Sequence, residues 1–292
     1  MREKLPDSTL DWVVEESFVD IAAMHPAVHR VIPVAVRRWR SQIARPAIWA
    51  EMRHFYRTLR ADAYDCVIDT QGLLKSALIT SRARGRKHGF DSESAREPIA
   101  SRFYDVKHGV KRDMHAVDRN RMLTAGALGM KAGPNCDYGL VAPRGSPVPH
   151  AAPYCVLLTM TSRADKLWPE EYWVELVRQL AKAGLESLLP WGSEAEYNSC
   201  RRVVSTAACG VVLRSMSLRE LASLIATAKV VFGVDTGLTH LAVALNAPTV
   251  GLFCGSDPLL TGLHGSGKLA NLGGPGDPPL PSHAFNAFMA LN

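Results

Sequence analysis

Short apolar runs alternate with amphipathic segments through most of the chain. In the second half, runs rich in leucine and β-branched residues occupy positions 154–158, 187–190, 210–213, 229–234 and 248–253. Runs of this length and composition are typical of buried strands in a parallel sheet. Segments with helical periodicity separate them, at 169–183, 194–205, 217–226 and from 238 onward. The pattern predicts a parallel sheet built from successive strand–helix units.

The first half shows the same alternation. Strands are predicted at 10–14, 31–36, 65–69 and 87–90, and helices near 17–24, 46–59, 73–83 and 115–128. The proline-rich stretch 141–153 is the best domain boundary. We therefore predict an α/β protein with two doubly wound parallel-sheet domains, 1–145 and 146–292, and a weak helix in the C-terminal tail at 281–292. Ligands of such folds bind beyond the carboxyl ends of the strands, here in a cleft between the halves.

The segment 229–245 carries the strongest chemical signal. A predicted strand ends at Asp235-Thr236-Gly237, and the helix that follows contains His240. Asp and Thr favour helix starts, Gly237 has no Cβ to hinder a ligand, and a helix N-terminus attracts phosphate. Thr236 and His240 are four residues apart and share one helix face. From these residues alone, an ordinary capped helix with a satisfied histidine is an equally good interpretation.

The loop after the first strand of the second half is also polar. It contains Thr161, Ser162, Arg163 and Lys166. Two hydroxyls and two cations can hold a diphosphate and stabilise charge on a leaving group. The loop alone is better explained as a solvated surface. Combined with Asp235-Thr236-Gly237 at the same edge of one sheet, it favours phosphate binding.

Two further residues of the second half lie at positions suited to a nucleotide. Glu196 follows a predicted strand, where acidic residues of nucleotide-binding sheets accept hydrogen bonds from a ribose. An exposed first-turn glutamate is an equally good interpretation. Met216 is more typical of a core position than of an adenine-binding wall.

Composition excludes several classes of protein. The 292 residues are 47% hydrophobic and 21% charged, as in folded globular proteins, and every apolar run is too short for a membrane span. The N-terminal residues lack the apolar core of a signal peptide. The six cysteines include no Cys-x-x-Cys pair, so neither zinc nor disulfides are indicated, and reduced, buried thiols of a cytosolic protein are expected.

Positive charge is concentrated in the first half. Residues 1–145 contain 24 Lys and Arg against 17 Asp and Glu, whereas the remainder contains 10 against 11. A basic half beside a nearly neutral one suggests an anionic partner. No nucleic-acid-binding motif accompanies the charge, so nucleic acid is not the predicted partner. An anionic lipid and an acidic sugar fit equally well.

The densest basic cluster is Arg37-Arg38-Trp39-Arg40, at the end of a predicted strand. Arginine is suited to bidentate recognition of carboxylates and phosphates, and Lys75 and Arg96 are candidates for the same patch. A solvated basic loop is the alternative interpretation.

Neither a metal nor a cofactor is predicted. The segment 262–269 has the glycines and lysine of a P-loop, but Leu269 occupies the position of the magnesium-binding Ser or Thr, and no strand precedes the segment. The chain also lacks an Asp-x-Asp pair that would hold magnesium on a sugar nucleotide.

Six stretches resemble the lipopolysaccharide heptosyltransferase I family, in the same order and over most of the chain, from residue 7 to at least residue 257. They are 11–16, 31–40, 68–73, 95–98, 166–171 and 235–240. The stretch Asp235-Thr236-Gly237-Leu238-Thr239-His240 is shared with other heptosyltransferases. The stretches Arg37-Arg38-Trp39-Arg40 and Ala95-Arg96-Glu97-Pro98 point more narrowly to the first enzyme of the series.

The resemblance implies the GT-B fold, with two Rossmann-like domains around a cleft. It implies metal-independent, inverting transfer of L-glycero-D-manno-heptose from ADP-heptose to Kdo of Kdo2–lipid A, by a cytoplasmic protein at the cytoplasmic face of the inner membrane. The positions that match the family's donor contacts are Thr161, Ser162, Lys166, Glu196, Met216, Asp235, Thr236, Gly237 and His240. The family's Thr-Thr pair is Thr161-Ser162 here, which keeps both hydroxyls. The acceptor patch corresponds to Arg37, Arg38, Arg40, Lys75 and Arg96.

One departure concerns the catalytic base. Family members begin with an apolar strand and a Gly-Asp loop, whose Asp is the proposed base that activates the acceptor hydroxyl. Met1 corresponds to a point just after that segment, so the strand and the base are expected to be absent, through a misplaced start site or truncation. Asp69 also lies at a strand end, but nothing in the sequence supports it as the base. The catalytic residue therefore stays unassigned. The alternatives are an inactive ADP-sugar-binding homologue and a heptosyltransferase acting on a later core acceptor.

Overall fold

The computed structural model describes residues 5–143 and 153–291. They fall into two compact units, Met1–Pro134 and Asn135–Asn292. The proline-rich stretch expected to separate the domains lies mostly outside the described residues. The chain divides earlier because the residues after Pro134 pack with the second unit. The Tyr138 hydroxyl donates to the His264 carbonyl oxygen at 2.7 Å, and the Ser266 backbone N–H donates to the Cys136 carbonyl oxygen at 3.2 Å.

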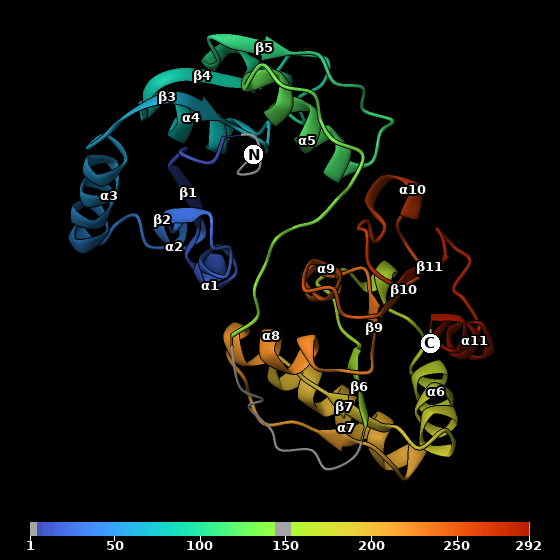
Figure 1. Cartoon of the computed structure of the whole chain (residues 1–292). Coiled ribbons are helices and arrows are strands. Elements are labelled where there is room, and N and C mark those ends of the chain that lie inside the picture. Colours follow the sequence, from blue (N-terminus) through green and yellow to red (C-terminus); the bar gives the residue numbers. More distant parts are fainter. Residues whose placement is uncertain (1–4, 144–152, 292) are drawn as a thin grey trace. The chain divides into compact units, whose positions relative to one another are not determined.

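The second unit is built on a six-stranded sheet in which every pairing is parallel (Figure 1). The strand order is β11-β10-β9-β6-β7-β8. The strands are β6 (Tyr154–Leu158), β7 (Glu186–Leu189), β8 (Val211–Val212), β9 (Val230–Val234), β10 (Thr249–Phe253) and β11 (Leu269–Gly273). The helices are α6 (Glu170–Lys182), α7 (Glu194–Ala207), α8 (Leu218–Ala226), α9 (Gly237–Ala244), α10 (Pro258–Thr261) and α11 (Pro281–Leu291).

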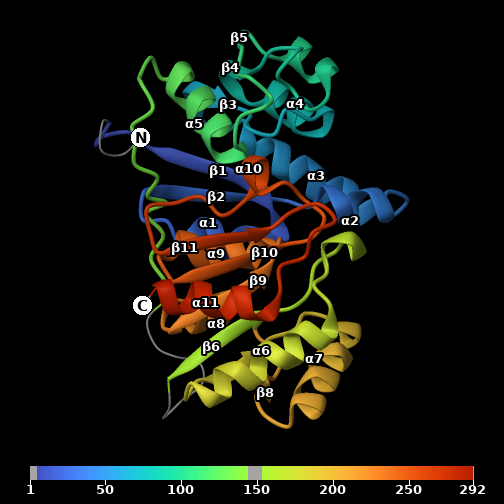
Figure 2. The ribbon, with the colours of Figure 1, turned by 90° about the vertical axis from the view of Figure 1, so that its right-hand side faces the viewer.

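Helices cover both faces of this sheet, which explains why its central strands are buried throughout and mostly apolar. Every residue of β6, β9 and β10 is buried. On one face, Trp173 and Leu180 of α6 pack with Phe288 of α11, and Figure 2 shows α11 in front of β9 and β10. On the other face, Leu224 of α8 packs with Ala242 of α9. The predicted doubly wound parallel sheet is therefore confirmed for this unit.

The first unit has the same strand–helix alternation. Its strands are β1 (Leu10–Glu15), β2 (Val28–Val34), β3 (Ala63–Ile68), β4 (Arg84–Phe90) and β5 (Val106–His108). Its α-helices are α1 (Val19–Ala23), α2 (Val36–Ser41), α3 (Pro46–Leu59), α4 (Leu74–Arg82) and α5 (Ala116–Ala127), with the 3-10 helices η1 (Glu16–Phe18) and η2 (Pro98–Phe103). All pairings are parallel, but the strands form two sheets, β1-β2 and β3-β4-β5. The predicted parallel strand–helix alternation is therefore present here, divided between two sheets.

Side chains, rather than backbone hydrogen bonds, hold the two small sheets together. Helix α3 packs Ile48, Phe55 and Leu59 against β2 and against Val67 of β3. The Tyr64 hydroxyl of β3 donates to Asp11 of β1 at 2.7 Å. Within residues 5–143, no backbone hydrogen bond joins β1 to β3. In its described part, the first unit therefore consists of two parallel sheets, β1-β2 and β3-β4-β5, that are joined by side-chain contacts.

The basic cluster differs from its prediction. Residues 36–41 form α2 rather than a strand end followed by a loop, and β2 ends at Val34. Trp39 is buried in the core, with its ring 5.4 Å from that of Phe55 in an edge-to-face arrangement. The indole therefore does not lie among the arginines. Its burial anchors α2 and turns Arg37 and Arg40 outward.

Two expectations from composition can be compared with the described residues. All six cysteines are free thiols, and four of them are buried. In the described parts of the chain, each helix is too short or too polar to cross a lipid bilayer.

Candidate functional site

Three neighbouring strands of the second unit end at one edge of the sheet. Strand β9 lies between β6 and β10, and all three run in the same direction. Asp235 directly follows β9, the 161–166 loop follows β6, and Ser256 follows β10. The loops after β6 and β10 are in contact, because a Cβ added at Gly255 would meet the Asp165 carbonyl oxygen at 2.4 Å. The parallel topology therefore brings polar groups from three loops to one place.

The carboxylate of Asp235 is the centre of this arrangement. Lys166 Nζ lies 2.5 Å from Oδ2, and the Ser256 hydroxyl donates to the same oxygen at 2.6 Å. His240 Nε2 lies 3.4 Å from Oδ1. The Thr161 hydroxyl donates to the backbone carbonyl oxygen of Asp235 at 3.2 Å. We call these five residues the Asp235 cluster.

Burial and charge act in opposite directions on Asp235. Its side chain is 8% exposed, and this burial raises the pKa of the carboxyl group. The three side-chain hydrogen bonds from the cluster and the ammonium charge of Lys166 lower the pKa by more than burial raises it. The pKa of Asp235 therefore lies well below its usual range, and the residue is a carboxylate at neutral pH. It serves to hold Lys166 and His240 in place, and its low pKa makes it a poor base.

Helix α9 begins directly beside this carboxylate. Thr236 is its N-cap residue, but the Thr236 side chain makes no capping hydrogen bond. The alternative interpretation, an ordinary helix capped by these side chains, does not hold: Thr236 forms no cap, and the Asp235 carboxylate binds side chains of the cluster. Among the described residues, the backbone N–H groups of Gly237 and Leu238 have no partner, and a Cβ at Gly237 would meet nothing within 4 Å. An uncapped helix start with open space before it suits an anion.

The close approach of α9 to its strand depends on Gly233. A Cβ there would lie 2.2 Å from Thr239 Oγ1, and that hydroxyl donates to the Val234 carbonyl oxygen at 2.7 Å. Thr239 is fully buried, so the first turn of α9 is fixed against the end of β9. This contact sets the direction in which the helix start points.

The remaining donor candidates lie at the ends of β6, β7 and β8. Ser162 is exposed beside Thr161. Glu196 is in the first turn of α7, and its Oε2 accepts a hydrogen bond from the Gly192 backbone N–H at 2.7 Å. Met216 is half-buried and packs against the core. The structure places each of them beyond a strand's carboxyl end in the second unit, and it ties only Thr161, Lys166 and His240 directly to Asp235.

Sequence reasoning missed Ser256. The signal was present, since Ser256 follows a predicted strand that ends at residue 253, but no motif singled it out. Its hydroxyl donates to a buried carboxylate, and hydrogen bonds to charged groups contribute about 1.5–3 kcal/mol. We expect Ser256→Ala to lower the free energy of unfolding by about 2 kcal/mol in urea denaturation. Ser256→Thr, which keeps the hydroxyl, is the control. An equal loss in both variants would contradict the role of this hydrogen bond.

The acceptor candidates all lie in the first unit, after the carboxyl ends of its strands. Arg37, Arg40, Lys75 and Arg96 are exposed, on α2, α4 and the loop after β4. Arg38 is different, because its guanidinium group binds the carboxylates of Glu16 and Glu51 at 2.6–2.9 Å. Two carboxylates neutralise Arg38, so it is better suited to fixing α2 than to binding an anion.

Arg119 extends the basic surface around Arg96 and was not found from the sequence. It lies on α5, donates to the Ser94 carbonyl oxygen at 2.5 Å, and stacks 4.9 Å from the ring centre of Phe90. Burial and the positive charges of Arg112 and Arg96 lower its pKa. Clustered arginines of this kind attract an anion. No motif marks Arg119 in the sequence, since only the packing of α5 on β4 brings it beside Arg96.

Asp69 is excluded as a base by its surroundings. It is 4% exposed and accepts hydrogen bonds from the Tyr104 hydroxyl at 2.7 Å and from the backbone N–H of Gln71 at 2.9 Å. The carboxylate stabilises the turn after β3, in which Gly72 has a φ of +62°. This is a structural role, so the catalytic residue stays unassigned.

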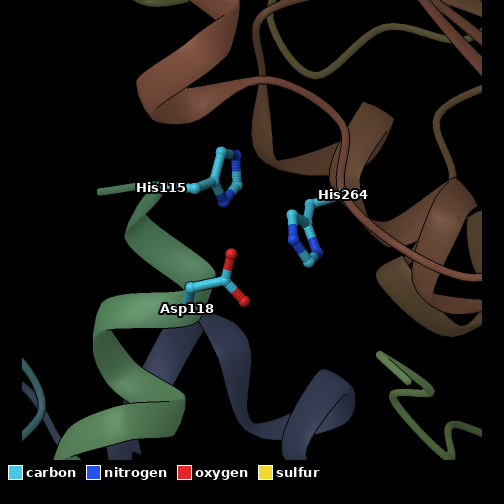
Figure 3. A group of neighbouring side chains, drawn as sticks. All are labelled: His115, Asp118 and His264. Carbon is cyan, nitrogen blue, oxygen red and sulfur yellow. The ribbon is translucent and has the colours of Figure 1, made fainter. Parts of the chain in front are cut away.

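The potential metal ligands drawn in Figure 3 do not make a metal site within one unit. His115 and Asp118 lie one turn apart at the start of α5, whereas His264 belongs to the second unit. His115 Nδ1 accepts a hydrogen bond from the Val117 backbone N–H, and Asp118 pairs with Arg121 at 3.3 Å. Protein zinc sites use at least three side-chain ligands. Both residues of the first unit are explained by helix capping and an ion pair.

Comparison with protein families matches residues 52–274 to glycosyltransferase family 9 (heptosyltransferase). Among curated proteins, the chain is 44% identical to lipopolysaccharide heptosyltransferase 1 of Escherichia coli K12 over 271 residues, covering 92% of this chain and 85% of that protein. It is also 44% identical to the Pseudomonas aeruginosa protein of the same name over 268 residues, covering 91% of this chain and 75% of that protein.

Solved structures show the same relationship. E. coli heptosyltransferase WaaC with ADP matches with a TM-score of 0.89 and 40% identity, over 100% of this chain and 92% of that chain. WaaC with ADP-2-deoxy-2-fluoro heptose matches with a TM-score of 0.83 and 39% identity, over 99% of this chain and 91% of that chain. The E. coli ADP-heptose lps heptosyltransferase II matches in fold, with a TM-score of 0.76 at 20% identity, over 99% of this chain and 91% of that chain. These matches confirm the predicted fold class, an α/β fold with parallel sheets like the GT-B heptosyltransferases.

Proposed function

This chain belongs to glycosyltransferase family 9, the heptosyltransferase family, and we propose that it transfers L-glycero-D-manno-heptose from ADP-heptose to Kdo of Kdo2–lipid A. One observation carries the proposal. The Asp235 cluster and the open start of α9 bring the Lys166 ammonium group and unpaired backbone N–H groups to one edge of the sheet, in a chain 44% identical to lipopolysaccharide heptosyltransferase 1. Only that combination points to a sugar diphosphate as the ligand.

The donor is proposed to bind along the carboxyl edge of the six-stranded sheet. The related WaaC has been solved with ADP and with an ADP-heptose analogue. In this chain, Lys166 and the first N–H groups of α9 are suited to the diphosphate, and the Ser162 hydroxyl can donate to it. The Thr161 hydroxyl can donate to the diphosphate in place of its bond to the Asp235 carbonyl oxygen. Glu196 is proposed to accept from the ribose, and Met216 to contact the adenine. Asp235, Thr236, Gly237 and His240 complete the site.

The proposed reaction is a single displacement with inversion. The acceptor hydroxyl oxygen forms a bond to the anomeric carbon, and the bond from that carbon to the diphosphate oxygen breaks. The hydroxyl proton passes to a base that is not assigned, and ADP leaves with the electron pair. Negative charge that develops on the leaving oxygen is stabilised by Lys166 and the start of α9, so the step is proposed to need no metal.

The acceptor is proposed to bind to the first unit. Arg37, Arg40, Lys75 and Arg96 are suited to the carboxylates of Kdo and the phosphates of lipid A. Arg119 is added to this group and Arg38 is assigned the supporting role described above. Because lipid A is a membrane lipid, the enzyme is proposed to act as a peripheral protein at the cytoplasmic face of the inner membrane.

A transfer assay tests the function. The protein is incubated with ADP-heptose and Kdo2–lipid A, and the lipid is analysed by mass spectrometry for the mass of one added heptose. A second protein carries, ahead of residue 1, the N-terminal segment of the E. coli relative. We expect transfer by the extended protein at least, and no transfer by either protein would refute the proposal.

Two alternatives give different results. An ADP-sugar-binding homologue without activity would bind ADP-heptose in calorimetry while neither protein transfers it. A heptosyltransferase of a later step would prefer an acceptor that already carries heptose. The extended protein and both acceptors therefore separate the three functions.

A further inference from the structure

The turn between α2 and α3 and the first turn of α3 expose several apolar side chains on either side of Arg45. Of residues 43–50, six are both apolar and exposed: Ile43, Ala44, Pro46, Ala47, Trp49 and Ala50. Trp49 is 50% exposed and Ile43 45%, whereas Ile48 between them points into the core. We call residues 43–50 the apolar turn. Scattered exposed apolar residues are common, but six of them within eight residues, including a tryptophan, indicate a binding surface.

The orientation of Trp49 is fixed, and its polar atom is already satisfied. Its indole N–H donates to the Ile43 carbonyl oxygen at 2.9 Å. The bond holds the indole against the turn while half of its surface stays accessible. A tryptophan presented in this way can enter an apolar environment without leaving an unpaired donor. Tryptophan is also enriched at the boundary between lipid and water.

The surroundings of the apolar turn are strongly cationic. Residues 36–60 contain seven arginines and one carboxylate, Glu51. That carboxylate is bound to Arg38. Arg40, Arg45, Arg53 and Arg57 are exposed, and in the described part of the chain none of them forms a salt bridge. An apolar protrusion ringed by unneutralised arginines is complementary to an anionic lipid surface, where apolar side chains enter the interface and arginines meet the headgroups.

We propose that the apolar turn docks the first unit on an anionic membrane. Ile43 and Trp49 enter the headgroup region, and Arg40, Arg45, Arg53 and Arg57 bind lipid phosphates. Since α2 leads directly into the turn, docking brings Arg37 and Arg40 to the membrane surface. The inference extends the proposed function by adding how a lipid-bound acceptor is reached. Vesicle binding needs neither donor nor acceptor, so its failure is distinguishable from failure of the transfer assay.

Sedimentation with vesicles tests the docking. The probes are vesicles of phosphatidylglycerol and phosphatidylcholine in equal parts, and vesicles of phosphatidylcholine alone. We expect binding to the first and at least about tenfold weaker binding to the second, because each arginine near an anionic surface contributes about fivefold. The double variant Ile43→Ser, Trp49→Ser is expected to bind the anionic vesicles about tenfold more weakly. The charge variant Arg45→Gln, Arg53→Gln is expected to lose about thirtyfold.

The matched control is Trp12→Ser, because Trp12 is 47% exposed on β1 of the same unit and lies outside the apolar turn. It should bind like the unchanged protein, and circular dichroism should show that all variants fold. Three results would overturn the proposal: no binding to anionic vesicles, equal binding by the turn variants, or equal loss in the Trp12 control. Concentration-dependent self-association that Ile43→Ser, Trp49→Ser abolishes, without any vesicle binding, would show a protein partner instead.

Discussion

Replacing Lys166 with methionine is expected to lower kcat/KM for heptose transfer by about a hundredfold to a thousandfold. The ammonium group lies 2.5 Å from the Asp235 carboxylate, and its side chain is 18% exposed, so it is both held in place and accessible. A cation fixed before the reaction stabilises charge on the departing diphosphate without having to be reoriented. Methionine keeps most of the length of the side chain and removes the charge. The assay is steady-state heptose transfer. It uses whichever of the two proteins of the transfer assay, the given chain or the extended one, transfers heptose.

Arg163 provides the matched control for this prediction. It belongs to the same loop, but its side chain is 60% exposed and paired with Asp165, which is also exposed. Arg163→Met is expected to change kcat/KM by less than about threefold, because exposed ion pairs contribute little. Circular dichroism and ADP calorimetry on both variants separate loss of charge from loss of folding. Equal losses in the two variants would show that the position of Lys166 in the Asp235 cluster has no special role.

The second large effect is expected from Asp235→Asn, on stability. The substitution leaves Lys166 without its partner in a site that is mostly buried, and breaking such a pair costs about 3 kcal/mol or more. Hydrogen exchange of peptides from β9 and α9 measures this loss within the second unit. The control is Asp165→Asn, an exposed carboxylate whose replacement should cost less than about 0.5 kcal/mol.

The dependence on pH follows from the lowered pKa of Asp235. Because the folded state holds this proton less tightly than the unfolded state, the stabilising contribution is complete above the ordinary carboxyl pKa of 3.8. It is lost progressively as the pH falls below that value toward the pKa in the folded state. The unchanged protein should therefore lose protection of β9 and α9 on acidification below about pH 4, and Asp235→Asn should lose less over the same interval. Identical pH profiles for the two proteins would contradict the assignment.

Much of the fold could be predicted from the alternation of apolar strands and amphipathic helices. Strand β6 and helix α3 coincide with their predicted ranges, and α11 lies where a weak helix was expected. Strand β11 was missed, because Leu269–Gly273 has no β-branched residue and is a strand through its pairing with β10. Helix α2 was missed for a similar reason. A helix of six residues is too short to show a periodic pattern in the sequence. The burial of Trp39 in the core holds this segment in its helical position.

For the site, the sequence identified the residue types and their loops. It placed Lys166 and His240 at strand ends, and a parallel sheet then requires them to lie at one edge. Spacing along the chain could not show that Asp235 is shared by Lys166, His240 and Ser256, since these come from three separate loops. The alternative in which the Thr236 side chain caps α9 is not realised, because that side chain makes no hydrogen bond to the first turn of the helix.

The sequence by itself determined the parallel α/β architecture, the basic character of the first half and the family, because each depends on local pattern or on residue order. The tertiary structure alone decided which charges are neutralised and which stay available. Arg38 is bound by Glu16 and Glu51, whereas Arg40 stays exposed only two residues away. Neutralisation depends on which side chains meet across the fold, and such contacts join residues that are distant in sequence.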